Sequence, residues 1–506
     1  MKWLLKWPQA VLLAAALGAL QTLAFIHTEA WWLPPAATGL LAWLAARATH
    51  GRAALLGWAF GTAWLGAGTG WLFISLHRYG GLPAWLAVTA VFALSAFLSL
   101  YLAAAMAAFA RWRSRRAAAD ALLFGAVWGL AEAARAIIFT GFPWVASGYA
   151  QVDSGLALLA PWVGIYGIGA VGAGLAAWAA LAPGGVAMRL LRPVGLVAAL
   201  ALLGQFVSPV DFTRPAGSLT VTLLQGNVPQ EEKFAPQQQG AALEWHLQQL
   251  IAADTDLVVA PETAVPFLPQ EMPEGFWAAL QGRFATGRTH ALFGVPQGDD
   301  VLGYTNSAIG FAPGRAAYRY DKHHLVPFGE FIPFGFKWFT RMMNIPLGDF
   351  ARGPLVAPSF AVAGQRVAPN ICYEDLFGEE LAARFTGPAG GDAAAPTVFA
   401  NLSNIGWFGD SIAISQHLQI SRFRTLEFQR PMLRATNTGA TAIIDHQGRV
   451  SAWLAPHTRG VLRGSVQGRD GITPFAWWAG RFGLWPLVVS GAMVVAMAAR
   501  RRRTGP

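Results

Sequence analysis

The chain contains a single cysteine, Cys372, in a setting that could make its thiol a nucleophile. A largely apolar run, residues 362–371, leads up to it, and the acidic pair Glu374-Asp375 follows and opens an expected helix. A thiol at a strand-to-helix junction lies where backbone N–H groups and the helix dipole can lower its pKa from about 8.5. A buried, inert cysteine is equally compatible with this stretch, so the rest of the chain has to decide between the two.

Two further residues with chemical potential also follow short apolar runs. Glu262 comes after residues 257–261, and Lys322 lies in segment 320–324, beyond an apolar run that ends at Phe311. A carboxylate can accept a thiol proton, a lysine can stabilise the oxyanion of a tetrahedral intermediate, and a thiolate can attack a carbonyl carbon and hold the acyl group as a thioester. Taken singly, Glu262 could be a helix cap and Lys322 a solvated turn residue, so the argument for chemistry rests on the three residues together.

The elements that would position these residues have the pattern of an α/β domain between residues 219 and 445. Short β-rich runs are expected as strands at 219–224, 257–260, 291–295, 307–311, 367–371, 397–400 and 441–444. Helices are expected between several of them, at 237–253, 274–285, 375–385 and 414–433. Alternation of this kind favours a layered α/β architecture, in which reactive residues gather beyond the carboxyl ends of strands.

The composition of the whole chain indicates a membrane protein. Of its 506 residues, 54% are hydrophobic and only 13% are charged, and the mean hydropathy is +0.40, which suits a membrane protein better than a soluble one. The net charge of +10 could suggest a nucleic-acid partner. Many basic residues, however, lie in short clusters between apolar runs, a pattern that favours membrane topology.

Eight apolar runs predict a polytopic α-helical membrane bundle of about eight spans. They lie roughly at 7–26, 30–46, 53–76, 82–110, 118–138, 156–182, 193–210 and 475–499. Most reach the roughly 20 residues that a bilayer core requires. The second run is short and carries Pro34-Pro35, which makes it the weakest of the eight.

Loop charges orient these spans. One set of alternating connections and ends carries Lys2, Lys6, Arg47, Arg52, Arg111, Arg113, Arg115, Arg116, Arg189, Arg192 and the arginines 500–503, whereas the opposite short loops hold Arg78 alone. The positive-inside rule then places both termini in the cytoplasm. We therefore expect a membrane bundle at 1–210, a catalytic domain on the periplasmic face at 211–474, and a last span with an arginine-rich cytoplasmic tail at 475–506.

Glu132 and Arg135 fall within the fifth expected span, three residues apart. Ionisable groups inside a span are costly and often functional, but this spacing favours a self-neutralising pair near the outer end of the helix. The aromatic loop that follows contains Trp144, which is expected in an interfacial belt or in a lining for lipid access.

In their local settings Glu262, Lys322 and Cys372 resemble the Glu-Lys-Cys triad of the nitrilase, or carbon–nitrogen hydrolase, superfamily. With a membrane bundle before this domain and one span after it, the chain resembles the apolipoprotein N-acyltransferases over essentially its whole length. Supporting motifs lie at 225–230, 304–307, 328–331, 407–410 and 434–439. The resemblance implies an α-β-β-α sandwich that uses neither a metal nor a cofactor.

Carried over to this chain, the family roles make the triad glutamate the general base, the lysine the oxyanion stabiliser and the cysteine the nucleophile. Glu330, Tyr373 and Glu374 match positions at which family members need the side chain. Glu330 could hold the lysine or relay protons, and the backbone N–H of Tyr373 is a candidate oxyanion donor.

Two positions depart from the family pattern. Phe234 stands where the family often has tryptophan, and Ile405-Gly406 follows Asn404 where an aspartate is usual. Candidates for substrate contact or for a mobile membrane-facing arm are Phe234, Trp338, Met342, Met343, Trp407 and Trp144.

The resemblance implies a two-step acyl transfer. The acyl chain, by resemblance the sn-1 chain of phosphatidylethanolamine, passes through a thioester on Cys372 to the α-amino group of an S-diacylglyceryl cysteine on an apolipoprotein, the last step of lipoprotein maturation. Alternatives are a membrane-tethered amidase and a transporter or scaffold with a degenerate nitrilase domain. The intact triad argues against a scaffold, the few charges in the spans argue against a transporter, and the eight-span anchor argues against a soluble substrate.

Overall fold

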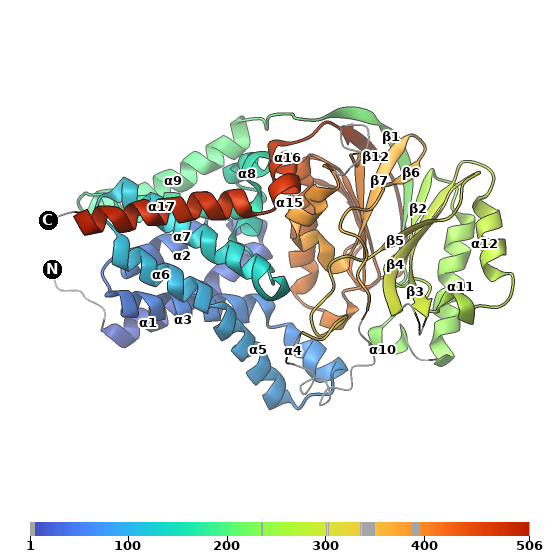
Figure 1. Ribbon diagram of the computed structural model, residues 1–506, viewed down its shortest axis with the longest axis horizontal. Coiled ribbons are helices and arrows are strands. Elements are labelled where there is room, and N and C mark those ends of the chain that lie inside the picture. Colours follow the sequence, from blue (N-terminus) through green and yellow to red (C-terminus); the bar gives the residue numbers. More distant parts are fainter. Residues whose placement is uncertain are drawn as a thin grey trace. The chain divides into compact units, whose positions relative to one another are not determined.

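The computed structural model describes residues 6–233, 236–299, 301, 303–333, 335, 350–386 and 395–504 (Figure 1). These residues form two compact units. The first, here called the helical unit, comprises the described parts of Met1–Phe73, Pro83–Val210 and Phe482–Pro506, and the second, the sheet unit, comprises those of Ile74–Leu82 and Asp211–Arg481. The two units do not show where a membrane lies. The expected bounds of the membrane bundle, the periplasmic domain and the last span therefore stay predictions.

The helical unit is built from long apolar helices. They are α1 (Trp7–Leu20), α2 (Leu33–Ala45), α3 (His50–Thr69), α5 (Ala84–Leu98), α6 (Leu100–Trp112), α7 (Ala117–Ile137), α8 (Ala160–Leu181), α9 (Val186–Phe206) and α17 (Trp485–Thr504). Glycines allow close approach at the crossings. A Cβ on Gly18 of α1 would lie 2.0 Å from the Phe60 carbonyl oxygen of α3, and one on Gly125 of α7 would lie 2.6 Å from the Ala170 oxygen of α8. Small residues at such crossings are typical of helix packing in membranes.

Five helical segments of the described chain are long and apolar enough to cross a membrane: Trp7–Phe25, Ala84–Trp112, Ala117–Thr140, Gly155–Leu181 and Ala187–Phe206. A sixth is reached if α16 (Pro474–Phe482) and α17 are one span. The expected count of eight therefore stays a prediction. The span expected at 475–499 stays a prediction, and the chain bends within it between α16 and α17, where Gly483 has a φ of +55°, a conformation that favours glycine.

The charged pair predicted inside the fifth span is present. An Arg135 nitrogen lies 3.5 Å from Glu132, and Glu132 also accepts hydrogen bonds from the Ser147 backbone N–H and hydroxyl at 2.7 and 2.6 Å. Arg135 donates to the carbonyls of Phe142 and Trp144. The pair therefore fixes the loop that follows α7.

The described part of the sheet unit contains two six-stranded sheets. The first has the order β12-β1-β2-β3-β4-β5 and the second β11-β10-β9-β8-β7-β6. Their strands are β1 (Arg214–Gln225), β2 (Leu257–Val259), β3 (His290–Asp299), β4 (Gly303–Phe311), β5 (Tyr318–Asp321), β6 (Phe360–Val362), β7 (Gln365–Ile371), β8 (Val398–Ser403), β9 (Met432–Thr436), β10 (Ala442–Ile444), β11 (Val450–Trp453) and β12 (Gly460–Asp470).

Three hydrophobic clusters define the layers of the sheet unit. Side chains from both sheets, such as Val221, Val259 and Ile371, form the cluster between the sheets. A second cluster joins the first sheet to α11 (Pro236–Ala252) and α12 (Phe276–Phe284). A third joins the second sheet to α14 (Gly378–Ala383), α15 (Ala413–Phe428) and α16. Because each sheet carries helices on its outer face, the unit is the α-β-β-α sandwich that the resemblance implied (Figure 1).

Two sequence expectations need correction in this unit. The helix expected at 414–433 ends at Phe428, because Gln429 adopts a left-handed φ of +47° and the chain then enters β9. Lys322 does not belong to the strand ending at Phe311 but follows β5 directly. Since β4 is antiparallel to both β3 and β5, β5 ends at the same sheet edge as β2 and β3. Lys322 therefore lies at the expected edge of the sheet, although it follows a different strand from the one expected.

Candidate active site

Cys372 lies directly after β7 and opens a short 3₁₀ turn, Cys372–Leu376. Its backbone has a φ of +52°, a left-handed conformation that is uncommon for a residue other than glycine and that clusters at functional sites. The residue is only partly buried, although the strand before it is buried on both faces. The fold therefore presents the thiol at the end of a rigid strand.

Four side chains form a network at the corresponding edge of the first sheet. Lys322 Nζ lies 2.8 Å from Glu330 Oε1 and 3.7 Å from Glu262 Oε1. Asn306 Nδ2 donates to the same two oxygens, at 2.7 Å to Glu262 and 2.8 Å to Glu330. Glu330 is held in turn by the backbone N–H of Val326 at 2.8 Å. We call Glu262, Asn306, Lys322 and Glu330 the carboxylate–lysine network.

Further contacts fix Glu262 from the opposite side. Its Oε2 accepts the backbone N–H of Asn404 at 2.8 Å, and its carbonyl oxygen accepts Lys233 Nζ at 3.0 Å. The backbone of β3 presses against it so closely that a Cβ on Gly294 would lie 2.7 Å from the Glu262 Cα. The carboxylate is thus positioned before any substrate binds, as a general base must be.

The charges of the network act on the thiol. Burial alone would lower the pKa of Lys322, but the carboxylates of Glu330 and Glu262 raise it above its ordinary value. Burial raises the pKa of the Cys372 thiol, Glu262 raises it further, and Lys322 opposes them. The lowering expected from the strand-to-helix junction is therefore outweighed, because burial and Glu262 together shift the pKa of the thiol upward.

Lys233 is a second buried lysine near the thiol. It is 5% exposed, and burial lowers its pKa to about 8 against the opposing charges of Glu262 and Cys372. Nothing in its sequence context distinguished it, because it lies in a short polar helix, α10 (Gln230–Lys233). Asn306, which was also missed as a functional residue, lies inside one of the supporting motifs.

Glu374 connects the two loops that carry the reactive residues. It accepts the backbone N–H groups of Ile371 at 2.6 Å and of His323 at 2.7 Å, and the Tyr320 hydroxyl at 2.8 Å. Because Ile371 precedes the cysteine and His323 follows the lysine, Glu374 fixes the separation of these two residues. Tyr373, 5% exposed, packs its ring against His324 and Phe377.

A second polar cluster, which the sequence did not predict, lies behind Cys372. Arg434 donates to His417 Nδ1 at 2.8 Å, and an arginine cannot accept a hydrogen bond, so the His417 proton must lie on Nε2. From there it points to Asp375 Oδ1 at 3.0 Å and to the Cys372 carbonyl at 3.3 Å. Asn401 donates to the same carbonyl at 3.2 Å. We call Asp375, His417 and Arg434 the backing cluster.

The remaining candidates from the sequence belong neither to the carboxylate–lysine network nor to the backing cluster. Phe234, Trp338, Met342 and Met343 lie outside the described residues. Trp407 is half-buried, with its ring 5.5 Å from that of Tyr79. Trp144, in the helical unit, is 2% exposed and packs against Trp71. Ile405, where the family usually has an acid, is 1% exposed and belongs to an apolar cluster that contacts Cys372, so no charge replaces the acid there.

Comparison with known proteins finds relatives of both units of the chain. Residues 17–178 match the family model of the apolipoprotein N-acyltransferase N-terminal domain, and residues 220–470 match that of carbon–nitrogen hydrolases. The apolipoprotein N-acyltransferase of Verminephrobacter eiseniae is 56% identical over 481 residues, covering 90% of this chain and 89% of the relative. That of Ralstonia nicotianae is 48% identical over 505 residues, covering 97% and 94%.

Among solved structures, a CN-hydrolase superfamily protein from Xanthomonas campestris matches with a TM-score of 0.37 at 18% identity, covering 54% of this chain and 97% of the other. The two relatives match this chain across both the helical and the sheet unit, whereas the Xanthomonas campestris structure covers about half of it. The chain belongs to the apolipoprotein N-acyltransferase family.

Proposed function

We propose that the protein N-acylates the N-terminal S-diacylglyceryl cysteine of apolipoproteins and carries the acyl group as a thioester on Cys372. The observation that supports this most is the buried carboxylate–lysine network, whose charges act on a lone thiol at a strand end. The names of the relatives supply the reaction class. Phospholipid is the acyl donor, and the sn-1 chain of phosphatidylethanolamine is the chain that the resemblance favours.

In the first step the thiol gives its proton to the Glu262 carboxylate while sulfur attacks the ester carbonyl carbon. Because burial raises the pKa of the thiol, attack coupled to proton transfer avoids a free thiolate, and we propose that the two occur together. The Lys322 ammonium stabilises the oxyanion that forms. Collapse of the intermediate breaks the ester C–O bond, and the leaving oxygen takes the proton from Glu262, which releases a lysophospholipid.

In the second step the neutral α-amino group of the acceptor attacks the thioester carbon. Glu262 takes a proton from the attacking nitrogen, the C–S bond breaks, and the sulfur regains that proton. Lys322 remains charged throughout because its pKa is raised. Its role is therefore electrostatic, and Glu262 carries the proton in both steps.

The proposed location is the bacterial inner membrane, with eight spans, both termini in the cytoplasm and residues 211–474 in the periplasm. The loop charges support this orientation, and Arg47, Arg113 and Arg189, from three loops assigned to the cytoplasm, line one cavity of the helical unit. A membrane-impermeant protease added to intact spheroplasts should cut within 211–474. Cleavage only after lysis would reverse the orientation.

A two-part experiment tests the function. Purified protein in phospholipid micelles should gain one fatty acyl mass on Cys372, and Cys372→Ala should not. A diacylated lipopeptide should then remove the adduct and become N-acylated itself. Absence of the adduct in the wild type would contradict the thioester mechanism, and loss of the adduct only as free fatty acid would indicate a hydrolase.

A further inference from the structure

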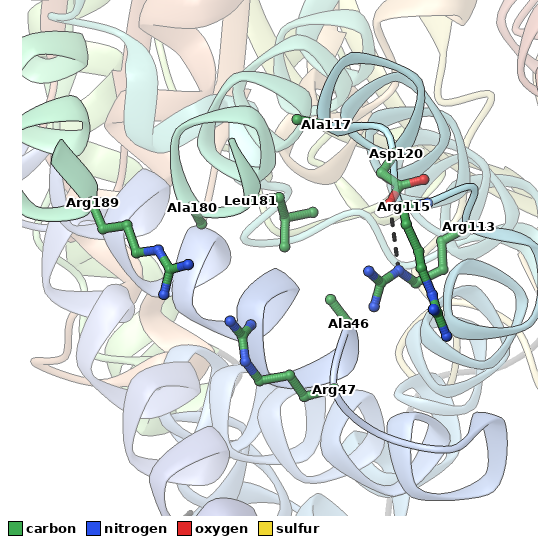
Figure 2. Close-up of a pocket in the computed structure, with 9 residues that line it drawn as sticks. All are labelled: Ala46, Arg47, Arg113, Arg115, Ala117, Asp120, Ala180, Leu181 and Arg189. Atoms are coloured by element: carbon green, nitrogen blue, oxygen red, sulfur yellow. Dashed lines mark hydrogen bonds and ion pairs between the residues drawn. The ribbon is translucent and has the colours of Figure 1, made fainter. Parts of the chain in front are cut away.

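The helical unit contains a basic cavity. None of the residues that line it belongs to the proposed acyl-transfer site. Its volume is about 230 Å³, and it is lined by Ala46, Arg47, Arg113, Arg115, Ala117, Asp120, Ala180, Leu181 and Arg189. These residues come from the ends of α2 and α8, the loop between α6 and α7 with the start of α7, and the first turn of α9. Figure 2 shows Arg47 and Arg189 reaching into the cavity from one side and Arg113 from the other.

The single acid of the lining is already committed to the loop before α7. Asp120, 2% exposed, accepts the backbone N–H groups of Ser114 at 2.6 Å and Arg115 at 3.1 Å, and the Arg113 Nε at 3.4 Å. Arg115 itself has a left-handed backbone conformation, with φ +63°. The loop is thus built so that Arg113 faces the cavity.

The positive charge of the cavity exceeds what Asp120 can neutralise. Within the part of the chain that the structure describes, no carboxylate forms an ion pair with Arg47, Arg115 or Arg189. Arg47 instead donates to the Trp43 carbonyl at 3.0 Å and lies 4.0 Å from the centre of the Trp43 ring. Burial, and then the positive charges of Arg189 and Arg113, lower the pKa of Arg47.

Topology alone accounts for basic residues near helix ends but not for their convergence. The positive-inside rule acts on loop composition, and arginines on separate loops could all point away into solvent. Here three loops direct them into one cavity, at the cost of mutual repulsion, which a bound anion would remove. Basic pockets between helices on the cytoplasmic side of a membrane are a known arrangement for anionic headgroups.

We propose that Arg47, Arg113 and Arg189, with Arg115 at the rim, form a binding site for a phosphate group. The planar guanidinium fork matches phosphate oxygens in pairs. The volume is below the roughly 300–1,000 Å³ of pockets for drug-sized ligands, so it suits a headgroup-sized anion. The cavity lies where α8 and α9, two candidate spans, meet, so the phosphate can come from an anionic phospholipid of that leaflet or from free phosphate.

The site would tie four segments of the helical unit together, and thermal unfolding of the full-length protein in neutral detergent tests this. At constant ionic strength, short-chain phosphatidylglycerol should raise the Tm in a saturable way, whereas phosphatidylcholine should not. The double variant Arg47→Gln/Arg189→Gln should need at least tenfold more phosphatidylglycerol for the same shift. The matched control Arg288→Gln/Arg463→Gln removes two exposed charges of the sheet unit and should respond like the wild type.

A parallel titration with inorganic phosphate separates the two sources. A shift with both ligands that the double variant weakens assigns the site to the phosphate group itself, and a shift with phosphatidylglycerol alone assigns it to the lipid. The proposal is overturned if neither ligand shifts the Tm or if the double variant responds like the control. Each variant should show a single cooperative unfolding transition without added ligand, which shows that it folds and keeps this test independent of the proposed acyl transfer.

Discussion

Two polar clusters act on Cys372, and they differ in the part of the residue that they affect. The carboxylate–lysine network places charges near the thiol, where Lys322 and Glu262 act on its pKa in opposite directions. The backing cluster resembles a catalytic triad in composition, but its atoms are engaged elsewhere. The His417 ring nitrogens meet Arg434 and Asp375, and Asp375 Oδ2 accepts the Ser421 hydroxyl at 2.6 Å.

This difference teaches that residue types alone do not identify the catalytic group. The hydrogen bond from His417 of the backing cluster to Cys372 reaches the carbonyl oxygen, so it fixes the backbone of the cysteine and not its thiol. Burial and the charge of Arg434 also lower the pKa of His417, which keeps the ring neutral. The two clusters should therefore respond differently to mutation.

The largest effect is expected for Glu262→Gln. The amide keeps the shape and the hydrogen bond from Asn404 but cannot accept the thiol proton, so the rate of thioester formation should fall by about 10²–10⁴-fold. Single-turnover mass spectrometry of the Cys372 adduct measures this rate. A wild-type rate would remove Glu262 from the role of base.

A somewhat smaller loss is expected for Lys322→Met. The apolar side chain removes the oxyanion partner, and loss of one such partner costs roughly 10²–10³-fold in rate. It also leaves Glu262 and Glu330 facing one another without a cation, so the Tm should fall too. The control Glu330→Gln keeps the lysine and should retain a larger part of the rate, as the same adduct assay can show.

In the backing cluster, His417→Ala should lower stability more than chemistry. It removes one hydrogen-bond partner of a buried aspartate and one of a buried arginine, at a cost of about 1–3 kcal/mol or more, and thermal unfolding should detect the loss. The adduct rate per folded molecule should remain within about tenfold of wild type. Should the alanine variant fail to fold, His417→Gln retains one donor and serves the same comparison.

The smallest effect on rate is expected for Lys233→Met, whose main consequence is a changed pH dependence of stability. The pKa of Lys233 is about 8 in the folded protein and about 10.4 in an unfolded chain. Between these values the unfolded chain binds the additional proton, so this lysine makes stability rise with pH over that window. The variant should lose that rise in Tm from pH 8 to 10. An unchanged rise would contradict the lowered pKa of Lys233 in the folded protein.

The proximity of Glu262 and Lys322 could be predicted because these two proposed reactive residues, like Cys372, follow short apolar runs. Lys322 was assigned to the wrong strand because β5 is only four residues long and is partly exposed. β12 was missed because its burial alternates irregularly and its pairing with β1 joins residues some 250 positions apart. β9 was merged with the helix before it, since the left-handed turn at Gln429 has no glycine to indicate it.

The contacts that complete the site depend on tertiary structure and leave little trace in the sequence. Asn306 bridges two carboxylates that lie 68 positions apart in the chain, Glu262 and Glu330. His417 lies in α15, where both apolar and polar side chains are buried. The sequence therefore does not distinguish it from its neighbours. Spacing therefore indicates which residues could react, whereas the side chains that hold them emerge only when the two sheets face each other.

The measurement that tests the central claim most directly is the single-turnover rate of thioester formation on Cys372 in two variants, Glu262→Gln and His417→Ala, with the folded fraction determined for each. The account predicts that His417→Ala forms the adduct at a rate within about tenfold of wild type, whereas Glu262→Gln is slower by about 10²-fold or more. Equal losses in the two variants, or a wild-type rate in Glu262→Gln, would contradict the division between a reacting network and a backing cluster.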